Sequence, residues 1–392
     1  MELLLGEDER AFQQRVRTWL AENLNERFTG PEVGRGPSDD RGFDIRLEWE
    51  RRLGEAGLLG ITWPVEYGGL GLTSREEIIF QLEYARAQAP YRVTYQGTGL
   101  VGPAILEFGT PEIKRRFLPR ILSVDDRWAQ GFSEPEAGSD LAAVRTRAER
   151  RGAEWIINGS KTWTTFAHHA NWLYVLCRTN ATASKHRGLS FLLVPMDQAG
   201  VEVRPITTML GTREFNEVFL TDARTEAGLV LGEVDRGWDV VMHLLKRERG
   251  TSMLPRSQSV EREVAQMFAL AERSGLAAQP RTRADLAQSL VISKVLSSQA
   301  IRLVERLLEQ GDLGPETSAA KLFATEGHQR IASAALDLLG RRGEVVMPGF
   351  ALNDWQTLFL GSRAETIYGG TSQIQKGILA ERVLGMPRDA RA

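Results

Sequence analysis

The sequence predicts an α+β chain of several segments: an N-terminal helical domain, a middle β-sandwich or barrel domain, and a C-terminal four-helix bundle. Three observations lead to this fold class. Apolar residues recur at helical spacing from about residue 9 to 122, as in Phe12, Val16 and Leu20. Short segments rich in β-branched and aromatic residues fill 128–231, and helical spacing then returns. A Rossmann fold and a TIM barrel are not expected, because both need alternating strands and helices throughout.

The predicted domain boundaries are 1–126, 127–232 and 233–392. In the first domain, Pro111 suits the first position of a helix, where its missing N–H costs nothing. The Gly/Pro-rich stretch at 63–72 predicts a loop. After the first amphipathic helix, further helices are expected at 44–56, 74–88, 98–108 and 111–121.

The middle domain is expected to contain short strands, because turn-forming pairs such as Asn158-Gly159 separate its apolar segments. These segments are EWIING, WLYVLCRT, LSFLLVPM, VEVRPI and NEVFL. The C-terminal helices are expected at 237–274, 283–311, 315–340 and 373–385, with a break in the sequence AAQPRTR.

Composition and charge exclude several classes of protein. The 392 residues carry 49 Lys+Arg and 51 Asp+Glu, a formal net charge of -2. Nucleic acid is therefore not expected as the main partner, because phosphate binding needs a basic excess or stripe. The single cysteine, Cys177, rules out an internal disulfide and a C-x-x-C site. No signal peptide, transit peptide or membrane span is expected, and the predicted location is the cytoplasm.

One G-x-G-x-x-G string, at Gly97–Gly102, could be a dinucleotide fingerprint. Such a fingerprint needs a buried strand before it, a helix after it, and an acidic residue about 20 positions on. Asp125 and Asp126 satisfy the distance, but the preceding YRVTYQ is too polar for a central parallel strand. We therefore interpret the glycines as small residues for close packing, with a nicotinamide cofactor as the alternative that an NAD titration would test.

Two common kinds of catalytic site are not expected. The five histidines form no H-E-x-x-H motif and no paired spacing with cysteines or carboxylates, which argues against a metal site. The G-x-S-x-G motif of α/β-hydrolases is also missing from the sequence.

Glu248 is the first candidate catalytic residue. In the helix expected from 237, an apolar stripe runs through Trp238, Val241 and Leu245 and then reaches Glu248. A carboxylate on a buried face is either paired or has a raised pKa, because desolvation disfavours its charged form. A raised pKa suits a general base, whereas an ion pair would be structural, and the periodicity fits both. The possible ion-pair partners are Arg247, Arg249 and Arg302.

The segment TIYGGTSQIQ, residues 366–375, is the second candidate. Gly369 and Gly370 allow a tight turn with positive φ. Ser372 and Gln375 match a capping box that opens the last helix. With Thr371 beside it, the helix N-terminus could bind a phosphate or pyrophosphate, and plain helix capping is the structural alternative.

Six segments together resemble the acyl-CoA dehydrogenase family over essentially the whole chain. They are WPVEYGGLGL, LEFGTPEIKRRFLPRIL, FSEPEAGSDLAAVRTRA, INGSKTWTTFAHHA, FNEVFLTDA and ETIYGGTSQIQKGILAERVLGMP. The SEPEAGSD and NGSKTW blocks are specific when they are found together in this order. The family fold, with an N-terminal helical domain, a middle β domain and a C-terminal helical bundle, matches the order of elements predicted above.

The resemblance implies an FAD enzyme that is usually a tetramer. The implied reaction is α,β-dehydrogenation of an acyl-CoA thioester, in which a carboxylate removes the α-proton and the β-hydrogen leaves as hydride to the flavin. Electrons then pass to an electron-transfer flavoprotein. Such chemistry needs a desolvated base and hydrogen-bond donors aimed in advance at the enolate oxygen.

The resemblance also implies site residues, taken position by position. Ser139 is expected near the CoA as well as the cofactor, and Thr371 and Gln373 match contacts to the adenosine-diphosphate part of FAD. The residues expected to contact the flavin ring and pyrophosphate are Gln130, Phe132, Ser133, Ser139, Trp163 and Thr165.

The position of the catalytic base separates two branches of this family. Many members carry Glu directly before the Gly-Thr of the last motif, where this sequence has Gly369. A smaller set places the base on the first helix of the C-terminal domain, next to an Arg, which matches Glu248 and Arg249. Glu248 is therefore the predicted base. Arg249 and Gly369 are the predicted substrate-binding residues, with Gly369 leaving extra room.

Two departures concern FAD contacts between subunits. Arg273 is the candidate for the arginine of an R-x-x-F-G motif, but the following SGLAAQ lacks Phe-Gly. A later pattern of Gln and paired glycines reads DLLGRRG at 337–343. With Gly369, these variations resemble a branch that acts on bulky or branched acyl-CoAs, including sterol side chains, as a homotetramer or an α2β2 heterotetramer. The alternatives are a non-catalytic partner subunit and a flavin monooxygenase or oxidase on the same fold.

Overall fold

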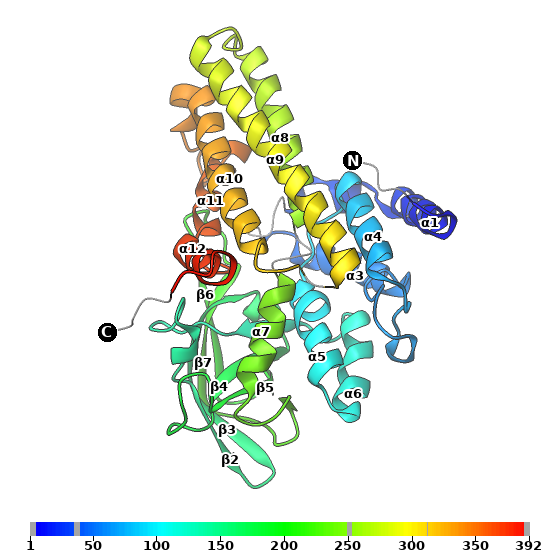
Figure 1. Ribbon diagram of the computed structural model, residues 1–392, viewed down its shortest axis with the longest axis vertical. Helices are drawn as coiled ribbons and strands as arrows, with labels where there is room; N and C mark the ends of the chain where they lie inside the picture. Colours follow the sequence, from blue (N-terminus) through cyan, green and yellow to red (C-terminus); the bar gives the residue numbers. More distant parts are fainter. Residues whose placement is uncertain (1–4, 35–39, 249–252, 312, 388–392) are drawn as a thin grey trace. The chain divides into compact units, whose positions relative to one another are not determined.

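The computed structural model describes residues 5–34, 40–248, 253–311 and 313–387. The chain forms two compact units: unit 1 comprises residues 1–208 and 212–248, and unit 2 comprises 209–211 and 249–392. Unit 1 holds the N-terminal helices, the β-sheet and helix α7, and unit 2 holds the helices from α8 onward (Figure 1). Within the described ranges, none of the helices has the length and apolar character needed to cross a bilayer.

The N-terminal helices of unit 1 bury one apolar face each, as the spacing predicts. In the first helix that face is Phe12, Val16 and Leu20. Thr110 caps the last of these helices and Pro111 occupies its first position. The helices are α1 (Glu7–Asn23), α2 (Glu26–Thr29), α3 (Phe43–Glu55), α4 (Ser74–Arg86), α5 (Gly102–Phe108) and α6 (Pro111–Leu122), with 3-10 turns at Pro31–Val33 and Val65–Tyr67.

The glycine string forms helix rather than a nucleotide-binding turn. Residues Gln96–Val101 are a π-helix that continues into α5, and the described residues 91–95 before it form no strand. A Cβ on Gly102 would lie 2.2 Å from Cη2 of Trp63, and one on Gly99 would lie 2.2 Å from the ring of Tyr95. The close-packing interpretation is therefore confirmed.

The middle segment folds into one eight-stranded sheet with the order β6-β7-β3-β2-β4-β5-β8, and β1 pairs with β4. β1 and β4 run parallel, whereas the β2–β3, β3–β7, β4–β5, β5–β8 and β6–β7 pairs are antiparallel. The strands are β1 (Trp128–Gly131), β2 (Arg147–Arg151), β3 (Glu154–Thr165), β4 (Trp172–Arg178), β5 (Leu189–Pro195), β6 (Val201–Ile206), β7 (Phe215–Glu226) and β8 (Val230–Leu231), with 3-10 turns at Leu141–Ala143 and Ala167–His169.

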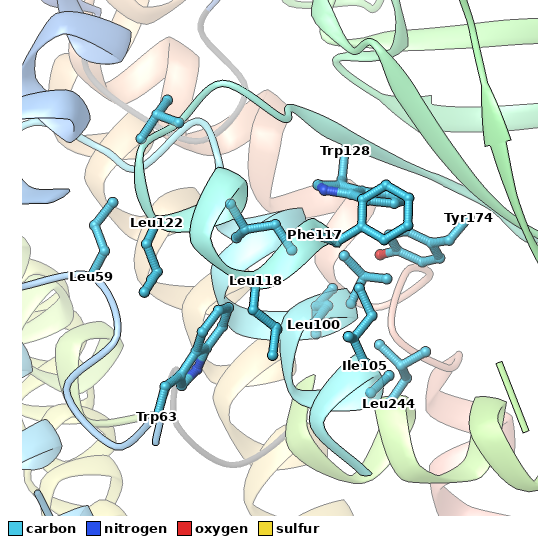
Figure 2. Packing of buried hydrophobic residues seen from close by; sticks show 14 of the residues in the cluster. Leu59, Trp63, Leu100, Ile105, Phe117, Leu118, Leu122, Trp128, Tyr174 and Leu244 are labelled. Atoms are coloured by element: carbon cyan, nitrogen blue, oxygen red, sulfur yellow. The ribbon is translucent and has the colours of Figure 1, made fainter. Parts of the chain in front are cut away.

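Strand β4 is buried on both faces and joins the sheet to the helices. Leu173, Val175 and Cys177 contribute to a core cluster made mostly of strand residues, whereas Tyr174 and Leu176 belong to the main cluster with α5, α6 and α7. Figure 2 shows Tyr174 lying close to Phe117 of α6 and Trp128 of β1, with Leu244 of α7 in the same cluster. The sheet therefore supports helix α7 (Gly237–Glu248), the helix predicted to carry the catalytic base.

The C-terminal helices follow the sequence prediction in part. The helix expected at 237–274 is described as two elements, α7 up to Glu248 and α8 from Met253, and residues 249–252 lie outside the described residues. Helix α11 was not expected, although Asn353 and Gln356 form its capping box. The helices are α8 (Met253–Arg273), α9 (Pro280–Gln310), α10 (Thr317–Leu339), α11 (Asp354–Glu365) and α12 (Ser372–Ile378), with a 3-10 turn at Gly340–Gly343 and a π-helix at Leu379–Val383.

Candidate active site

The end of strand β1 carries three of the predicted cofactor residues. Gln130 is half-buried and pairs with Tyr174 of β4. The ring of Phe132 is buried, 5.8 Å from the ring of Tyr174, so only its backbone is available to a ligand. The carbonyl of Ser133 accepts a hydrogen bond of 2.9 Å from the Thr162 N–H. This bond joins the β1 segment to the end of β3.

Strand β3 ends in an exposed aromatic side chain with a left-handed backbone. Trp163 is 58% exposed and has φ +59°, beside a register shift between Lys161 and Thr164. Its ring meets Phe215 edge-on at 5.8 Å, and Thr165 lies two residues further along the same strand. A strained residue that exposes so much apolar area is typical of a ligand site, where a flat aromatic ligand can cover it.

A buried ion pair, not predicted from the sequence, fixes both segments. Lys161 is 0% exposed, and its Nζ lies 2.8 Å from Oε1 of Glu134, 3.1 Å from the Phe132 carbonyl and 2.8 Å from the Leu176 carbonyl. Glu134 also accepts hydrogen bonds from the N–H groups of Arg145 and Thr146. Burial alone would raise the pKa of Glu134, but the Lys161 charge and these bonds hold it below its usual range. Each residue lies in one of the two specific blocks, SEPEAGSD and NGSKTW, but nothing in the sequence indicates that the two side chains pair.

Ser139 lies beside a basic depression in unit 1. Its exposed loop leads into the 3-10 turn at Leu141–Ala143. Ala143, Val144, Ala181 and Ala183 line a depression of about 430 Å³ together with four basic residues. The basic residues are Arg145, Arg147, Arg178 and Lys185. Two of these cations are partly neutralised, because Lys185 pairs with Asp140, and Arg145 pairs with Glu136 at 2.6 Å.

Helix α7 is fixed to the sheet at its first residue. A Cβ on Gly237 would lie 2.6 Å from the backbone N of Phe191, so only glycine permits this approach. The buried face of α7 is Val240, Val241 and Leu244. Glu248 is the last residue of the helix; its side chain, and Arg249 as a whole, lie outside the described residues. The assignment of these two residues remains a prediction.

In unit 2, the turn before α12 has the backbone that the two glycines predict. Gly369 has φ +63° and Gly370 has φ +91°. The capping box expected at Ser372 and Gln375 is wrong by one residue. Thr371 is the N-cap, its Oγ1 accepting from the Ile374 N–H at 3.2 Å. Nε2 of Gln375 instead donates to the carbonyls of Gly369 and Gly370.

Thr371 and Gln373 lie together in a depression of about 780 Å³ within unit 2. Arg330, Arg363 and Lys376 line it too, and their cations suit a pyrophosphate. Its remaining lining residues are Asp285, Glu326, Gln329, Ser333, Ala334, Asp337, Thr366, Ile367 and Ser372. Arg273 is not among them, since it is exposed at the last position of α8. The structure therefore groups two of the three cofactor residues predicted in this unit.

Comparisons with known proteins match the chain along nearly its whole length. Models of the acyl-CoA dehydrogenase N-terminal, middle and C-terminal domains match residues 6–125, 129–223 and 235–384. The chain is 44% identical over 387 residues to acyl-CoA dehydrogenase IpdE1 of Mycobacterium tuberculosis, covering 98% of this chain and 100% of that protein. It is 33% identical over 361 residues to acyl-CoA dehydrogenase FadE26 of the same organism, covering 89% and 90%.

Two solved structures are similar over nearly their full length. The Tcur3481-Tcur3483 steroid ACAD has a TM-score of 0.85 and 30% identity, covering 99% of this chain and 100% of that chain. The ChsE4-ChsE5 complex from Mycobacterium tuberculosis has a TM-score of 0.83 and 29% identity, with the same coverage.

Proposed function

Because the chain belongs to the acyl-CoA dehydrogenase family, we propose that it catalyses FAD-dependent α,β-dehydrogenation of a bulky acyl-CoA and passes electrons to an electron-transfer flavoprotein. The observation that carries the proposal is the strained, exposed indole of Trp163 beside Thr165, at a strand end that Lys161 and Glu134 lock to the β1 segment. A rigid, uncovered aromatic face next to hydroxyl and backbone donors fits a flavin ring.

The donor set of each unit fits one end of FAD. In unit 1, Trp163 offers an apolar face, and Gln130, Ser133 and Thr165 offer polar groups. In unit 2, Thr371 and Gln373 lie among arginine and lysine side chains that suit a pyrophosphate. When bound, the flavin would accept the hydride from the substrate's β-carbon.

Glu248 is the residue that would remove the α-proton. Gly369, at the family's usual position for the base, has no side chain that could accept a proton. Glu248 is the last residue of α7 and matches the position of the base in the smaller branch of the family. A carboxylate at that position can act as the general base.

The CoA end is assigned to the basic depression near Ser139. The basic side chains that line it can bind phosphate groups by charge-assisted hydrogen bonds. Such local charge is needed because the net charge of the chain is close to zero and attracts no anion by itself. Arg178 also donates to the carbonyls of Ala142 and Arg187, which fixes the two loops that border the depression.

A bulky acyl group, such as a sterol side chain, is supported by two observations. A Cβ on Gly369 would meet nothing within 4 Å, so this turn leaves open space. The similar structure with 30% identity is named a steroid ACAD. An α2β2 assembly with a related chain is the second candidate, because two similar structures are two-component proteins and Arg273 lacks its Phe-Gly neighbours.

The first experiment is purification of the chain alone and with a related chain encoded nearby, followed by an absorbance spectrum and a mass measurement. We expect a yellow protein with bound flavin. A colourless chain that becomes soluble and active only with its partner would favour the role of a non-catalytic subunit. Rapid oxidation of the reduced flavin by oxygen without CoA would favour an oxidase or monooxygenase instead.

The second experiment is anaerobic bleaching of the flavin with straight-chain, branched and sterol-side-chain acyl-CoAs. We expect the bulky substrates to bleach fastest. The Glu248→Gln variant should bleach about 10²–10⁴-fold more slowly, the range for loss of a general base. The matched control is Glu112→Gln on α6, whose side chain is 76% exposed. A Glu248→Gln variant as fast as the control would remove the base assignment.

A further inference from the structure

Lys321 of α10 binds the backbone that leads from α11 into the glycine turn. Its Nζ lies 3.1 Å from the carbonyl oxygen of Glu365, 3.0 Å from that of Tyr368 and 2.6 Å from that of Gly370. An ammonium group has three N–H donors, and each has an acceptor here. The charge also faces the C-terminal end of α11, where the helix dipole favours a cation.

Gln375 binds the same turn from α12. It is 0% exposed, and its Nε2 lies 3.1 Å from the Gly369 carbonyl and 3.3 Å from the Gly370 carbonyl. The carbonyls of residues 368, 369 and 370 are therefore all held by two side chains of unit 2. No freedom is left for these peptide planes to rotate without breaking a hydrogen bond.

This arrangement decides where the N–H groups of the turn point. In a trans peptide, the N–H points opposite to the carbonyl of the preceding residue. Because Lys321 binds the Tyr368 carbonyl, the Gly369 N–H points away from Lys321. Because Gln375 binds the Gly369 carbonyl, the Gly370 N–H points away from Gln375. Within the described part of the chain, neither N–H makes a hydrogen bond, and the Cβ position of Gly369 is open.

The first residue of this segment is fixed as well. The Glu365 carboxylate pairs with Arg256 of α8 and accepts from Nδ1 of His328 at 2.9 Å. Nε2 of His328 lies 2.8 Å from Oε2 of Glu263 on α8. Side chains of two helices, α8 and α10, therefore hold the Glu365 carboxylate, while Lys321 holds its carbonyl. The segment that leads into the turn is therefore held in place at its first residue, Glu365.

We propose that Lys321 is a positioning residue that aims the N–H groups of Gly369 and Gly370 at the thioester oxygen of the bound acyl-CoA. The inference rests on the proposed function, which places Gly369 at the substrate. Negative charge grows on the thioester oxygen as the α-proton leaves, and donors held in advance stabilise that charge without reorganising. Lys321 itself does not touch the substrate.

The test uses the flavin-loaded protein and a 3-thia-acyl-CoA, whose α-proton can leave but whose β-sulfur cannot give up a hydride. The resulting enolate gives a long-wavelength absorbance band with the flavin, and a pH titration of that band reports the pKa of the α-proton. In Lys321→Met, we expect this pKa to rise and kcat to fall by about 10²-fold, the effect of a small misplacement. Flavin content should stay at the wild-type level.

Lys294→Met is the matched control, since Lys294 lies on α9 of the same unit, is 66% exposed and pairs only with Glu261 among the described contacts. Gln375→Met is the second variant, which loosens the same turn without touching Lys321 and should raise the pKa by a smaller amount. An unchanged band and unchanged kcat in both turn variants would overturn the proposal. A wild-type protein that forms no band would instead contradict the proposed function.

Discussion

Lys161 in unit 1 and Lys321 in unit 2 each present three donors to three oxygen atoms, but the oxygen atoms differ. Lys161 is fully buried and binds one carboxylate and two carbonyls. Lys321 is half-buried and binds three carbonyls. The first lysine neutralises a charge inside the protein, and the second donates to the dipoles of three peptide groups.

This difference predicts separate roles for the two lysines: Lys161 stabilises the fold, whereas Lys321 positions a backbone segment. Loss of Lys161 would leave Glu134 charged and buried without a charged partner, which is among the costliest changes in a protein interior. Loss of Lys321 would leave carbonyl groups that water can reach in part, so the fold should survive. Substituting each lysine and comparing the loss of stability therefore tests whether the two lysines have these different roles.

The largest effect is expected for Lys161→Met. The free energy of unfolding should fall by about 3–5 kcal/mol, because a buried charge loses its partner. Urea unfolding followed by tryptophan fluorescence measures it. The double variant Glu134→Leu with Lys161→Met should regain most of the loss, since no charge is then stranded. If the double variant is as unstable as the single one, the ion pair is not the cause.

The stability of the protein should depend on pH through the charged cluster around His328. Burial alone would lower the pKa of His328, but its ring N–H groups donate to Glu263 and Glu365, and these carboxylates raise the pKa to about 9. The unfolded chain loses this proton near pH 6.5. The stabilisation is thus complete below about pH 6.5 and is lost as the pH rises through about 9. Thermal unfolding between pH 6 and 10 measures this loss.

The matched variant is His328→Gln, which keeps a polar side chain without a titrating proton. The melting temperature of this variant should not show the additional decline that we expect for the wild type between pH 6.5 and 9. A decline equal to that of the wild type would assign the pH dependence to another group.

Lys321→Met should cost less stability than either change above. We expect about 1–3 kcal/mol, the cost of leaving buried acceptors unsatisfied, reduced by the partial access of water. The same urea titration measures it, with Lys294→Met as the reference. If the free energy of unfolding falls as much as in Lys161→Met, the two lysines stabilise the fold equally and do not have the different roles described above.

The order of elements could be predicted because it depends on local periodicity. Phe12, Val16 and Leu20 recur at helical spacing, and the alternation along β4 is typical of a strand. The helix expected at 237–274 is described as two elements, α7 up to Glu248 and α8 from Met253. Periodicity reports a buried face and does not fix where a helix begins or ends.

The site could be predicted only where a residue belongs to a motif. Trp163 and Thr371 were predicted in this way. Lys161 and Glu134 were not, because 27 positions separate them and their pairing is a product of the fold. Lys321 was also missed: its three acceptors come from a turn more than 40 residues later, and in α10 it has the pattern of an ordinary surface lysine. Long-range contacts of this kind leave no local signal.

The smallest effect is expected for Thr371→Ala. The Thr371 hydroxyl accepts from the Ile374 N–H three residues later, so it acts within one turn of one helix, unlike the two lysines. Its loss should cost about 1 kcal/mol, the usual price of an N-cap. Thr371→Ser keeps the oxygen and should match the wild type in the same urea titration. If alanine and serine are equally stable, the cap is not supporting the turn, and Lys321 and Gln375 alone hold it in place.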